Sequence, residues 1–165
     1  MEELILGIGN TLKGDDGVGV YIVEKVGKYL KKVEKRPGKD SSTEAKKGII
    51  TIDCGTTPEN YTSVIRKHKP GRLILIDAAD MGLSPGSYRI IPLEKMGVMC
   101  ISTHKMPLAA FLSYVSELCR DIVLIGIQPG GMDFGITLSS VVRRSGDQVV
   151  NRIIEKRLNE IKTLS

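Results

Sequence analysis

The feature that most constrains this chain is a regular alternation of short apolar runs with segments whose apolar residues recur at helical spacing. Four runs rich in Leu, Ile and Val and one partly polar segment after a Ser-Pro-Gly turn are predicted strands: residues 4–8, 49–54, 73–76, 122–127 and 86–92. The segments with helical spacing are residues 15–32, 58–67, 107–119 and 138–161. Uninterrupted apolar strands separated by helices are typical of a sheet that is buried on both faces. The sequence therefore predicts an α/β fold with a twisted, mostly parallel five-stranded sheet and helices on both faces.

The length of 165 residues fits one domain of ordinary size. We expect a single three-layer domain over residues 1–165, interrupted by a basic mobile loop at residues 34–47 whose composition is rich in Lys, Ser and Gly. No window approaches the roughly 18 apolar residues that a membrane helix needs, and the start of the chain resembles no targeting peptide. A cytoplasmic protein without a membrane partner is expected. The absence of heptads makes a monomer the simplest oligomeric state.

The positive charge of the chain is confined to one segment. Residues 25–47 contain 9 basic and 3 acidic residues, whereas the rest of the chain contains 15 basic and 16 acidic residues. Aromatic residues make up only 4% of the chain, so the basic segment has no stacking platform for bases. We therefore expect no nucleic-acid partner. The three cysteines are too few and too widely spaced for a disulfide framework, and reduced thiols are expected.

A glycine-rich loop follows the first predicted strand, but it does not match a nucleotide-binding loop. The dinucleotide fingerprint requires a third glycine where Leu12 stands, and Asp15 and Asp16 replace the Lys and Ser/Thr of a phosphate-binding loop. Two carboxylates at this place would repel a phosphate. They are instead expected to stabilise the start of the following helix, with Asp15 as a helix cap.

Carboxylates and one histidine occupy positions where a parallel sheet usually carries its site. Ligands of such sheets bind outside the carboxyl ends of the strands, and Asp16 and Asp77 each follow a predicted strand. Of the two histidines, His68 lies in a basic surface stretch, whereas His104 directly precedes a predicted helix. Two carboxylates and an imidazole form an oxygen and nitrogen donor set that suits a divalent transition ion and leaves positions open. This set is a candidate metal site.

The glycine-rich motif and four later segments together resemble the [NiFe]-hydrogenase maturation endopeptidases. The segments occur in the family's order along nearly the whole chain: GIGNTL (7–12) with GDDGVG (14–19), DCGTTPEN (53–60), IDAADMG (76–82), STHKMPL (102–108) and LIGIQP (124–129). The PEN, DMG and THxMP forms are most similar to the branch that serves formate-hydrogenlyase and energy-converting hydrogenases. The loop at residues 34–47 is longer and more basic than expected for this family.

The resemblance implies a fold, an activity, a partner and a site. It implies a mostly parallel sheet between helices, and an enzyme that removes the C-terminal extension of the hydrogenase large-subunit precursor after nickel insertion. The family's metal ligands correspond to Asp16, Asp77 and His104. These residues would bind nickel carried by the substrate, although other divalent ions could occupy the site. Asp53 is a candidate for a polar role in cleavage.

Several alternatives remain open from the sequence. Cys54 and His104 could form a nucleophile and base pair, although no HExxH motif is present. The same residues could serve a non-catalytic nickel-binding chaperone of the large subunit. A nucleotide-binding protein and a phosphorylase-like enzyme are weaker alternatives, and the second rests on fold analogy alone.

Overall fold

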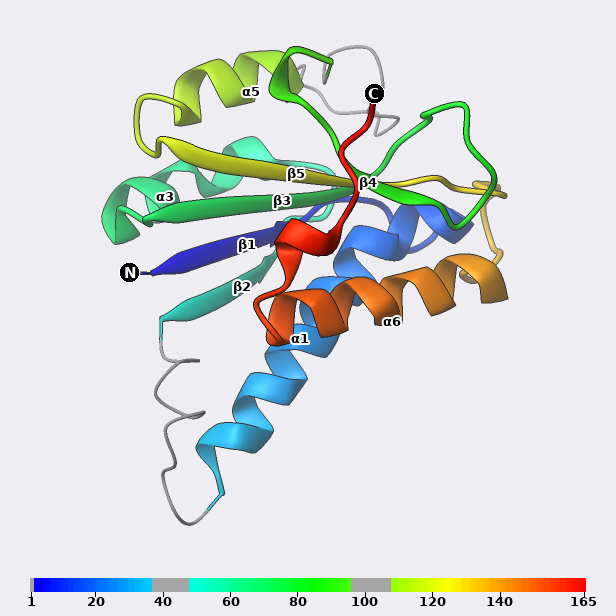
Figure 1. The fold of residues 1–165 in the computed structure, drawn as a ribbon, viewed down its shortest axis with the longest axis horizontal. Coiled ribbons are helices and arrows are strands. Elements are labelled where there is room, and N and C mark those ends of the chain that lie inside the picture. Colours follow the sequence, from blue (N-terminus) through cyan, green and yellow to red (C-terminus); the bar gives the residue numbers. More distant parts are fainter. Residues whose placement is uncertain (1, 37–47, 96–107) are drawn as a thin grey trace.

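The structure, a computed structural model, describes residues 2–36, 48–95 and 108–165 (Figure 1). Five strands and four α-helices alternate along these residues, with short 3-10 turns between them. The strands are β1 (Glu3–Gly7), β2 (Ile49–Asp53), β3 (Arg72–Ala78), β4 (Tyr88–Ile90) and β5 (Asp121–Ile127). The helices are α1 (Val18–Glu34), α3 (Thr62–His68), α5 (Leu108–Val115) and α6 (Ser140–Ile154), and the 3-10 turns are η1 (Gly14–Gly17), η2 (Pro58–Tyr61), η3 (Leu93–Lys95) and η4 (Leu158–Glu160).

The strands form one sheet in the order β2-β1-β3-β5-β4. β1 pairs in parallel with both β2 and β3, and β3 pairs in parallel with β5, whereas β4 runs antiparallel to β5. The sheet is therefore mostly parallel, with one short antiparallel edge strand. This confirms the predicted sheet.

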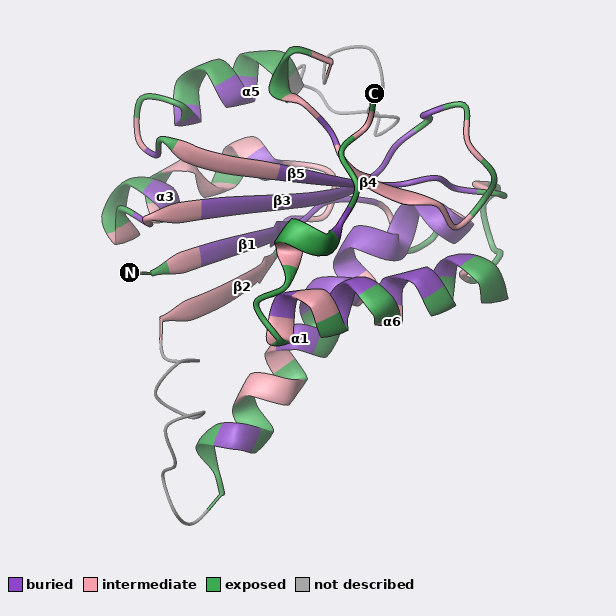
Figure 2. Cartoon of the chain, in the orientation of Figure 1, coloured by how far each residue is buried: buried purple, intermediate pink, exposed green. Residues whose placement is uncertain are grey.

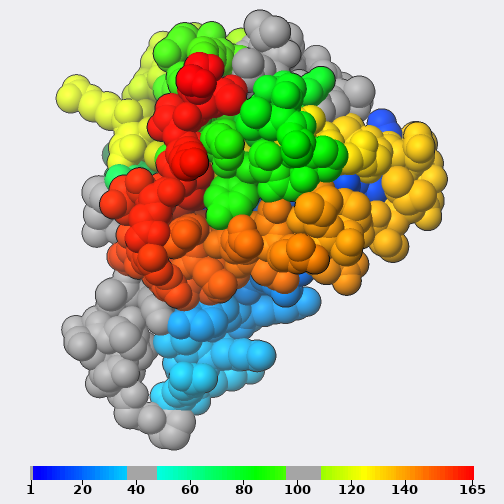
Figure 3. Space-filling view, turned by 45° about the vertical axis from the view of Figure 1, so that its right-hand side comes forward, coloured from blue at the N-terminus to red at the C-terminus, as the bar shows by residue number. Residues whose placement is uncertain are grey.

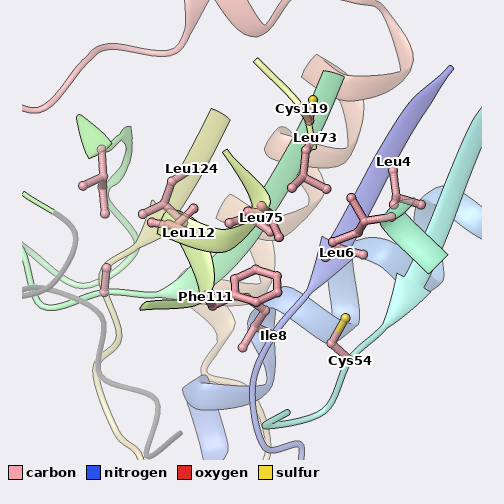
Figure 4. Close-up of a cluster of buried hydrophobic side chains, with 14 of the residues drawn as sticks. Leu4, Leu6, Ile8, Cys54, Leu73, Leu75, Phe111, Leu112, Cys119 and Leu124 are labelled. Atoms are coloured by element: carbon pink, nitrogen blue, oxygen red, sulfur yellow. The ribbon is translucent and has the colours of Figure 1, made fainter. Parts of the chain in front are cut away.

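Two helices cover each face of the sheet. The side chains of successive strand residues point to opposite faces, so Leu4 and Leu6 join one apolar cluster while Ile5 joins the other. The first cluster includes residues of α3 and α5, such as Phe111 and Leu112 (Figure 4), and the second includes residues of α1 and α6. Figure 2 shows the buried residues concentrated in β1, β3 and β5, with β2 and β4 only partly buried at the edges. The three-layer arrangement is the one that the sequence predicts.

The main difference from the predicted elements lies near the C-terminus. The helix predicted over residues 138–161 ends at Ile154, and Lys156 then takes a left-handed conformation with φ of 56°. The chain continues through η4, and Leu158 in this turn and Ile161 directly after it still pack on the core. The predicted loop at residues 34–47 begins within α1, because Glu34 is the last residue of that helix, and its residues 37–47 lie outside the described residues. Among the helices that the structure describes, none is both long enough and apolar enough to cross a membrane.

Candidate active site

The strand order places a topological switch point between β1 and β3. The α-helix that follows β1 is α1, on one face of the sheet, whereas the next described α-helix after β3 is α5, on the other face, so the loops after these two neighbouring strands diverge. Ligands of open α/β sheets bind in the crevice that such a divergence creates. Asp16 lies in η1 directly after β1, and Asp77 lies near the end of β3. Two of the predicted ligands thus share the carboxyl edge of adjacent strands.

Two glycines allow the loop after β1 to fold tightly against the sheet. Gly9 has a φ of 143°, and a Cβ atom there would lie 1.8 Å from the carbonyl oxygen of Asp16. A Cβ atom on Gly19 would lie 2.4 Å from the carbonyl oxygen of Ile76. Only glycine permits such approaches. Gly9 of the GIG motif (7–9) and Gly19 of the GVG motif (17–19) therefore position Asp16 beside the end of β3 rather than binding a phosphate.

Asp16 is buried but only partly satisfied. Its side chain is 3% exposed, and its Oδ2 accepts a hydrogen bond from the backbone N–H of Asn10 at 3.0 Å. Its Oδ1 is also buried and accepts no hydrogen bond from any residue that the structure describes. A buried carboxylate oxygen in this condition is costly unless a cation or a donor reaches it. Asp16 is therefore suited to bind a cation.

Asp77 is completely buried within the sheet. It pairs in register with Gly126 of β5, one residue beyond the predicted end of the third strand. The alternation along β3 places its side chain on the same face as Leu73 and Leu75, which is the face covered by α5. In the sequence, His104 directly precedes α5. Asp77 therefore faces the layer into which the histidine segment leads.

Asp15 has a different role from its neighbour, and the prediction that it caps the following helix is wrong. No side chain caps the first turn of η1 or α1. The Asp15 carboxylate instead accepts four hydrogen bonds from the loop before α6: Gly130 N–H (2.8 Å), Gly131 N–H (3.2 Å), Ser139 N–H (2.7 Å) and the Ser139 hydroxyl (2.9 Å). These donors lie more than a hundred residues away in the sequence. Asp15 ties the glycine-rich loop to the N-terminal end of α6.

Gln128 supports the site, and analysis of the sequence did not assign it a role. This buried side chain follows β5 and accepts hydrogen bonds from the backbone N–H groups of Met81 (2.7 Å) and Leu83 (3.3 Å). Its amide nitrogen also donates to Asp80 Oδ1 at 3.3 Å. Gln128 thus fixes the loop that follows Asp77. The sequence feature that could have indicated this role is the position of Gln128 in the LIGIQP segment, because a buried amide at the end of an apolar strand requires hydrogen-bond partners.

Asp53 and Cys54 follow β2 and occupy contrasting environments. Asp53 is exposed, accepts a hydrogen bond from Gly55 N–H at 2.8 Å, and lines a cavity of about 290 Å³ with residues of the loop after β1, including Asn10 and Leu12. Cys54 is 2% exposed, and burial, together with the nearby charges of Asp53 and Glu59, raises the pKa of its thiol to about 12. A thiol with that pKa provides almost no thiolate at neutral pH. Cys54 is therefore unsuited to the nucleophilic role considered from the sequence.

The two histidines fall in different parts of the chain. His104 belongs to residues 96–107, outside the described residues. His68 ends α3 near the amino ends of β1 and β3, on the side of the sheet away from the candidate site, and its Nδ1 lies 3.4 Å from Glu2. Within the described part of the chain, no three His, Cys, Asp or Glu side chains gather closely enough to hold a metal ion. The structure therefore supplies two carboxylates of the predicted set, and its third member remains a prediction.

Comparison with known proteins identifies the family. The family model described as hydrogenase maturation protease matches residues 20–156. The hydrogenase 3 maturation protease of Escherichia coli is 31% identical over 154 residues, which cover 93% of this chain and 89% of the relative. The chain belongs to the hydrogenase maturation protease family. It is accordingly an enzyme, a peptide hydrolase that acts as a maturation endopeptidase.

Solved structures of this family share the fold. The solution structure of the endopeptidase HycI from Escherichia coli aligns with a TM-score of 0.82 and 29% identity, covering 100% of this chain and 97% of that one. The crystal structure of the [NiFe] hydrogenase maturation protease HycI from Thermococcus kodakarensis aligns with a TM-score of 0.74 and 32% identity, over 96% of this chain and 93% of that one. The maturation protease fold thus extends over the whole domain, including the loops that carry Asp16, Asp53 and Asp77.

Proposed function

We propose that this endopeptidase removes the C-terminal extension of a [NiFe]-hydrogenase large-subunit precursor after nickel insertion. In this proposal Asp16, Asp77 and His104 bind the nickel that the precursor carries. The observation that carries the proposal is the state of Asp16, a buried carboxylate at the switch point whose Oδ1 accepts no hydrogen bond from the described residues. A cation delivered by the substrate would satisfy this oxygen.

The donor set suits recognition of a divalent ion. Two carboxylates and an imidazole are ligands of intermediate hardness, and three ligands leave coordination positions for groups of the substrate. A precursor without nickel would lack this anchor, so its scissile bond would not be held at the site. Other divalent ions could occupy the same residues. Nickel binding would then act as a check that metal insertion is complete.

Cleavage requires an activated water and a polarised carbonyl. Asp53 supports such a role because it is exposed at the cavity wall beside the loop that precedes Asp16, where a peptide bond next to the metal could reach it. The nickel could polarise the carbonyl or the water. We assign Asp53 to orient the water or to accept its proton, and we place the reaction in the cytoplasm, with a monomeric enzyme acting on the precursor.

A processing assay tests this function. Nickel-loaded and nickel-free precursors are each mixed with the protein at a molar ratio of about 100 to 1, and release of the extension is followed by mass spectrometry. Release from the nickel-loaded precursor alone is expected. Equal release from both precursors would contradict nickel recognition, and the absence of turnover beyond one equivalent would favour a non-catalytic chaperone.

Variants of the chain's two histidines provide a matched comparison. His104→Ala and Asp16→Asn are expected to lower the processing rate by at least ~100-fold, since even outer partners of metal ligands typically contribute 10–100-fold. His68→Ala is the control, because His68 lies on the side of the sheet away from the candidate site. Circular dichroism shows whether each variant is folded. Wild-type processing by the folded His104→Ala variant would overturn the assignment.

A further inference from the structure

The outer edge of β2 carries backbone groups that point away from the sheet. Cys54 N–H donates to the carbonyl of Gly7 at 2.9 Å, and Glu3 N–H donates to the carbonyl of Gly48 at 2.8 Å, so even-numbered residues face β1. In a strand the N–H and C=O of successive residues alternate in direction. The backbone groups of Ile49, Thr51 and Asp53 therefore point outward. β2 is the last strand on this side of the sheet that the described residues form.

A groove runs between this strand and α1. Its volume is about 400 Å³, and its walls come from α1 (Val23, Glu24, Gly27, Lys28 and Lys31) and from β2 (Thr51 and Asp53). Helix and strand approach closely at Gly27, where a Cβ atom would lie 2.9 Å from Thr51 Oγ1. Farther along, the C-terminal half of α1 extends beyond α6 (Figure 3). The groove is thus bounded by a strand edge on one side and by lysines on the other.

The groove adjoins the cavity at the candidate active site. Asp53 lines the groove, and it also lines the cavity formed with the loop after β1. A peptide lying along β2 would therefore reach the site at the carboxyl end of the strand. The opposite end of the groove leads toward Lys28 and Lys31.

We propose that the C-terminal extension of the precursor binds in this groove as an added strand, antiparallel to β2. This inference rests on the proposed function, because that function places the scissile bond at the site. The extension would leave the site beside Asp53 and run toward Ile49, so its direction opposes that of β2. An extension about as long as β2 would end with its terminal carboxylate near Lys28 and Lys31. The five residues of β2 span about 13 Å at ~3.3 Å per residue, which accommodates about five residues of the extension.

Main-chain pairing suits a substrate segment that is discarded after cleavage. Strand addition takes its affinity from backbone hydrogen bonds, and specificity comes from the pockets for alternate side chains. Here the nickel site would supply specificity, while the strand edge would hold the extension straight with its first peptide bond at Asp53. The lysines also resemble the charges that protect exposed strand edges from aggregation. A purely protective role predicts that charge reversal leaves substrate affinity unchanged.

Proline scanning of the precursor tests the pairing without altering the enzyme. Proline replaces each of the first five extension residues in turn, and kcat/KM is measured with nickel-loaded precursor. Because only every second N–H would face β2, losses of about tenfold or more are expected at alternate positions, with weaker effects between them. A flat profile would overturn strand addition. The unmodified precursor distinguishes the two hypotheses, since failure to cleave it contradicts the proposed function itself.

Charge reversal tests the direction of the extension. The double variant Lys28→Glu/Lys31→Glu is expected to raise KM by about tenfold at low ionic strength with little change in kcat, and 0.5 M salt should reduce the difference. Lys162→Glu is the matched control, because Lys162 is exposed beside β4 at the far edge of the sheet. An unchanged KM in the double variant, or an equal rise in the control, would overturn the proposed orientation.

Discussion

Asp15 and Asp16 are adjacent, equally charged and both buried, yet their contacts predict opposite consequences for the same substitution. The Asp15 Oδ2 accepts hydrogen bonds from two backbone N–H groups and the Ser139 hydroxyl, while its Oδ1 accepts one from Ser139 N–H. Asparagine can supply only one oxygen. If that oxygen takes the Oδ2 position, the amide nitrogen faces Ser139 N–H, and two donors oppose each other without a partner.

The expected cost of Asp15→Asn follows from these four contacts. A hydrogen bond to a charged group contributes roughly 1.5–3 kcal/mol, and an unsatisfied buried donor costs about 1–3 kcal/mol. The favourable interaction of the carboxylate with the N-terminal end of α6 is also lost, at about 0.3–1 kcal/mol. Allowing for partial relaxation, we expect the free energy of unfolding to fall by about 2–4 kcal/mol.

Asp16→Asn is expected to change stability by less than about 1 kcal/mol. The amide oxygen can keep the hydrogen bond from Asn10 N–H, and a neutral amide is less costly to bury than a carboxylate. Processing of nickel-loaded precursor should nevertheless fall by at least ~100-fold. The two neighbouring variants should therefore separate stability from activity.

Urea unfolding measures this difference. The chain contains no tryptophan, so far-UV circular dichroism is the appropriate signal. With a slope of about 2 kcal/mol per molar urea, the midpoint for Asp15→Asn should fall by about 1–2 M, whereas that for Asp16→Asn should fall by less than about 0.5 M. Equal midpoints for Asp15→Asn and wild type would refute the structural role of Asp15. A larger loss in Asp16→Asn, or wild-type processing by it, would refute the ligand role of Asp16.

Four further predictions follow from the same contacts. Cys54→Ala should retain processing, and alkylation of Cys54 should stay slow from pH 7 to 10 because the pKa of its thiol is raised to about 12; rapid alkylation would contradict its burial. Gln128→Leu should lower the free energy of unfolding by about 2–3 kcal/mol, measured in urea, because two backbone N–H groups lose their acceptor. The hydrogen bond from Lys25 lowers the pKa of Asp147 below its ordinary value of 3.8. At pH values above 3.8 this pairing should stabilise the fold by less than about 1 kcal/mol, and the stabilisation should vanish as the pH falls through the lowered pKa of the folded state. The stabilities of Asp147→Asn and the wild type, measured by acid unfolding, should therefore converge at low pH. A divalent ion at 100 times its dissociation constant should stabilise the wild type by about 2.7 kcal/mol, and calorimetry should find no such effect in Asp16→Asn.

The strands could be predicted because their signal is local. Each run of Leu, Ile and Val is a strand in the structure, because β-branched residues favour strands even in the partly buried edge strand β2. The end of α6 could not be predicted in the same way. Leu158 and Ile161 continue the apolar pattern and do pack on the core, but they lie in and directly after a 3-10 turn that follows the end of the helix at Ile154. Apolar spacing indicates which residues are buried, and here the buried residues continue beyond the end of α6.

The site could be predicted only as far as its chemistry depends on strand ends. Asp16 and Asp77 could be placed at one edge of the sheet because parallel strands bring their carboxyl ends together. The hydrogen-bond partners of Asp15 could not be predicted, because its donors at residues 130–139 are connected to the first loop by no local pattern. The same holds for Gln128 and the loop after Asp77. Long-range partners decide which of two adjacent carboxylates is structural.

The unequal treatment of these two carboxylates is itself an argument about function. Burying a carboxylate is expensive, and the fold offsets that cost fully for Asp15 with four donors. For Asp16, the described residues provide one donor and leave Oδ1 without a hydrogen bond. Gly9 packs against the backbone of Asp16, and the hydrogen bond from Asn10 N–H holds the Asp16 side chain in its buried position. A residue held in this condition is pre-organised for a ligand, since the cost of desolvating its carboxylate has been met during folding and need not be met again on binding.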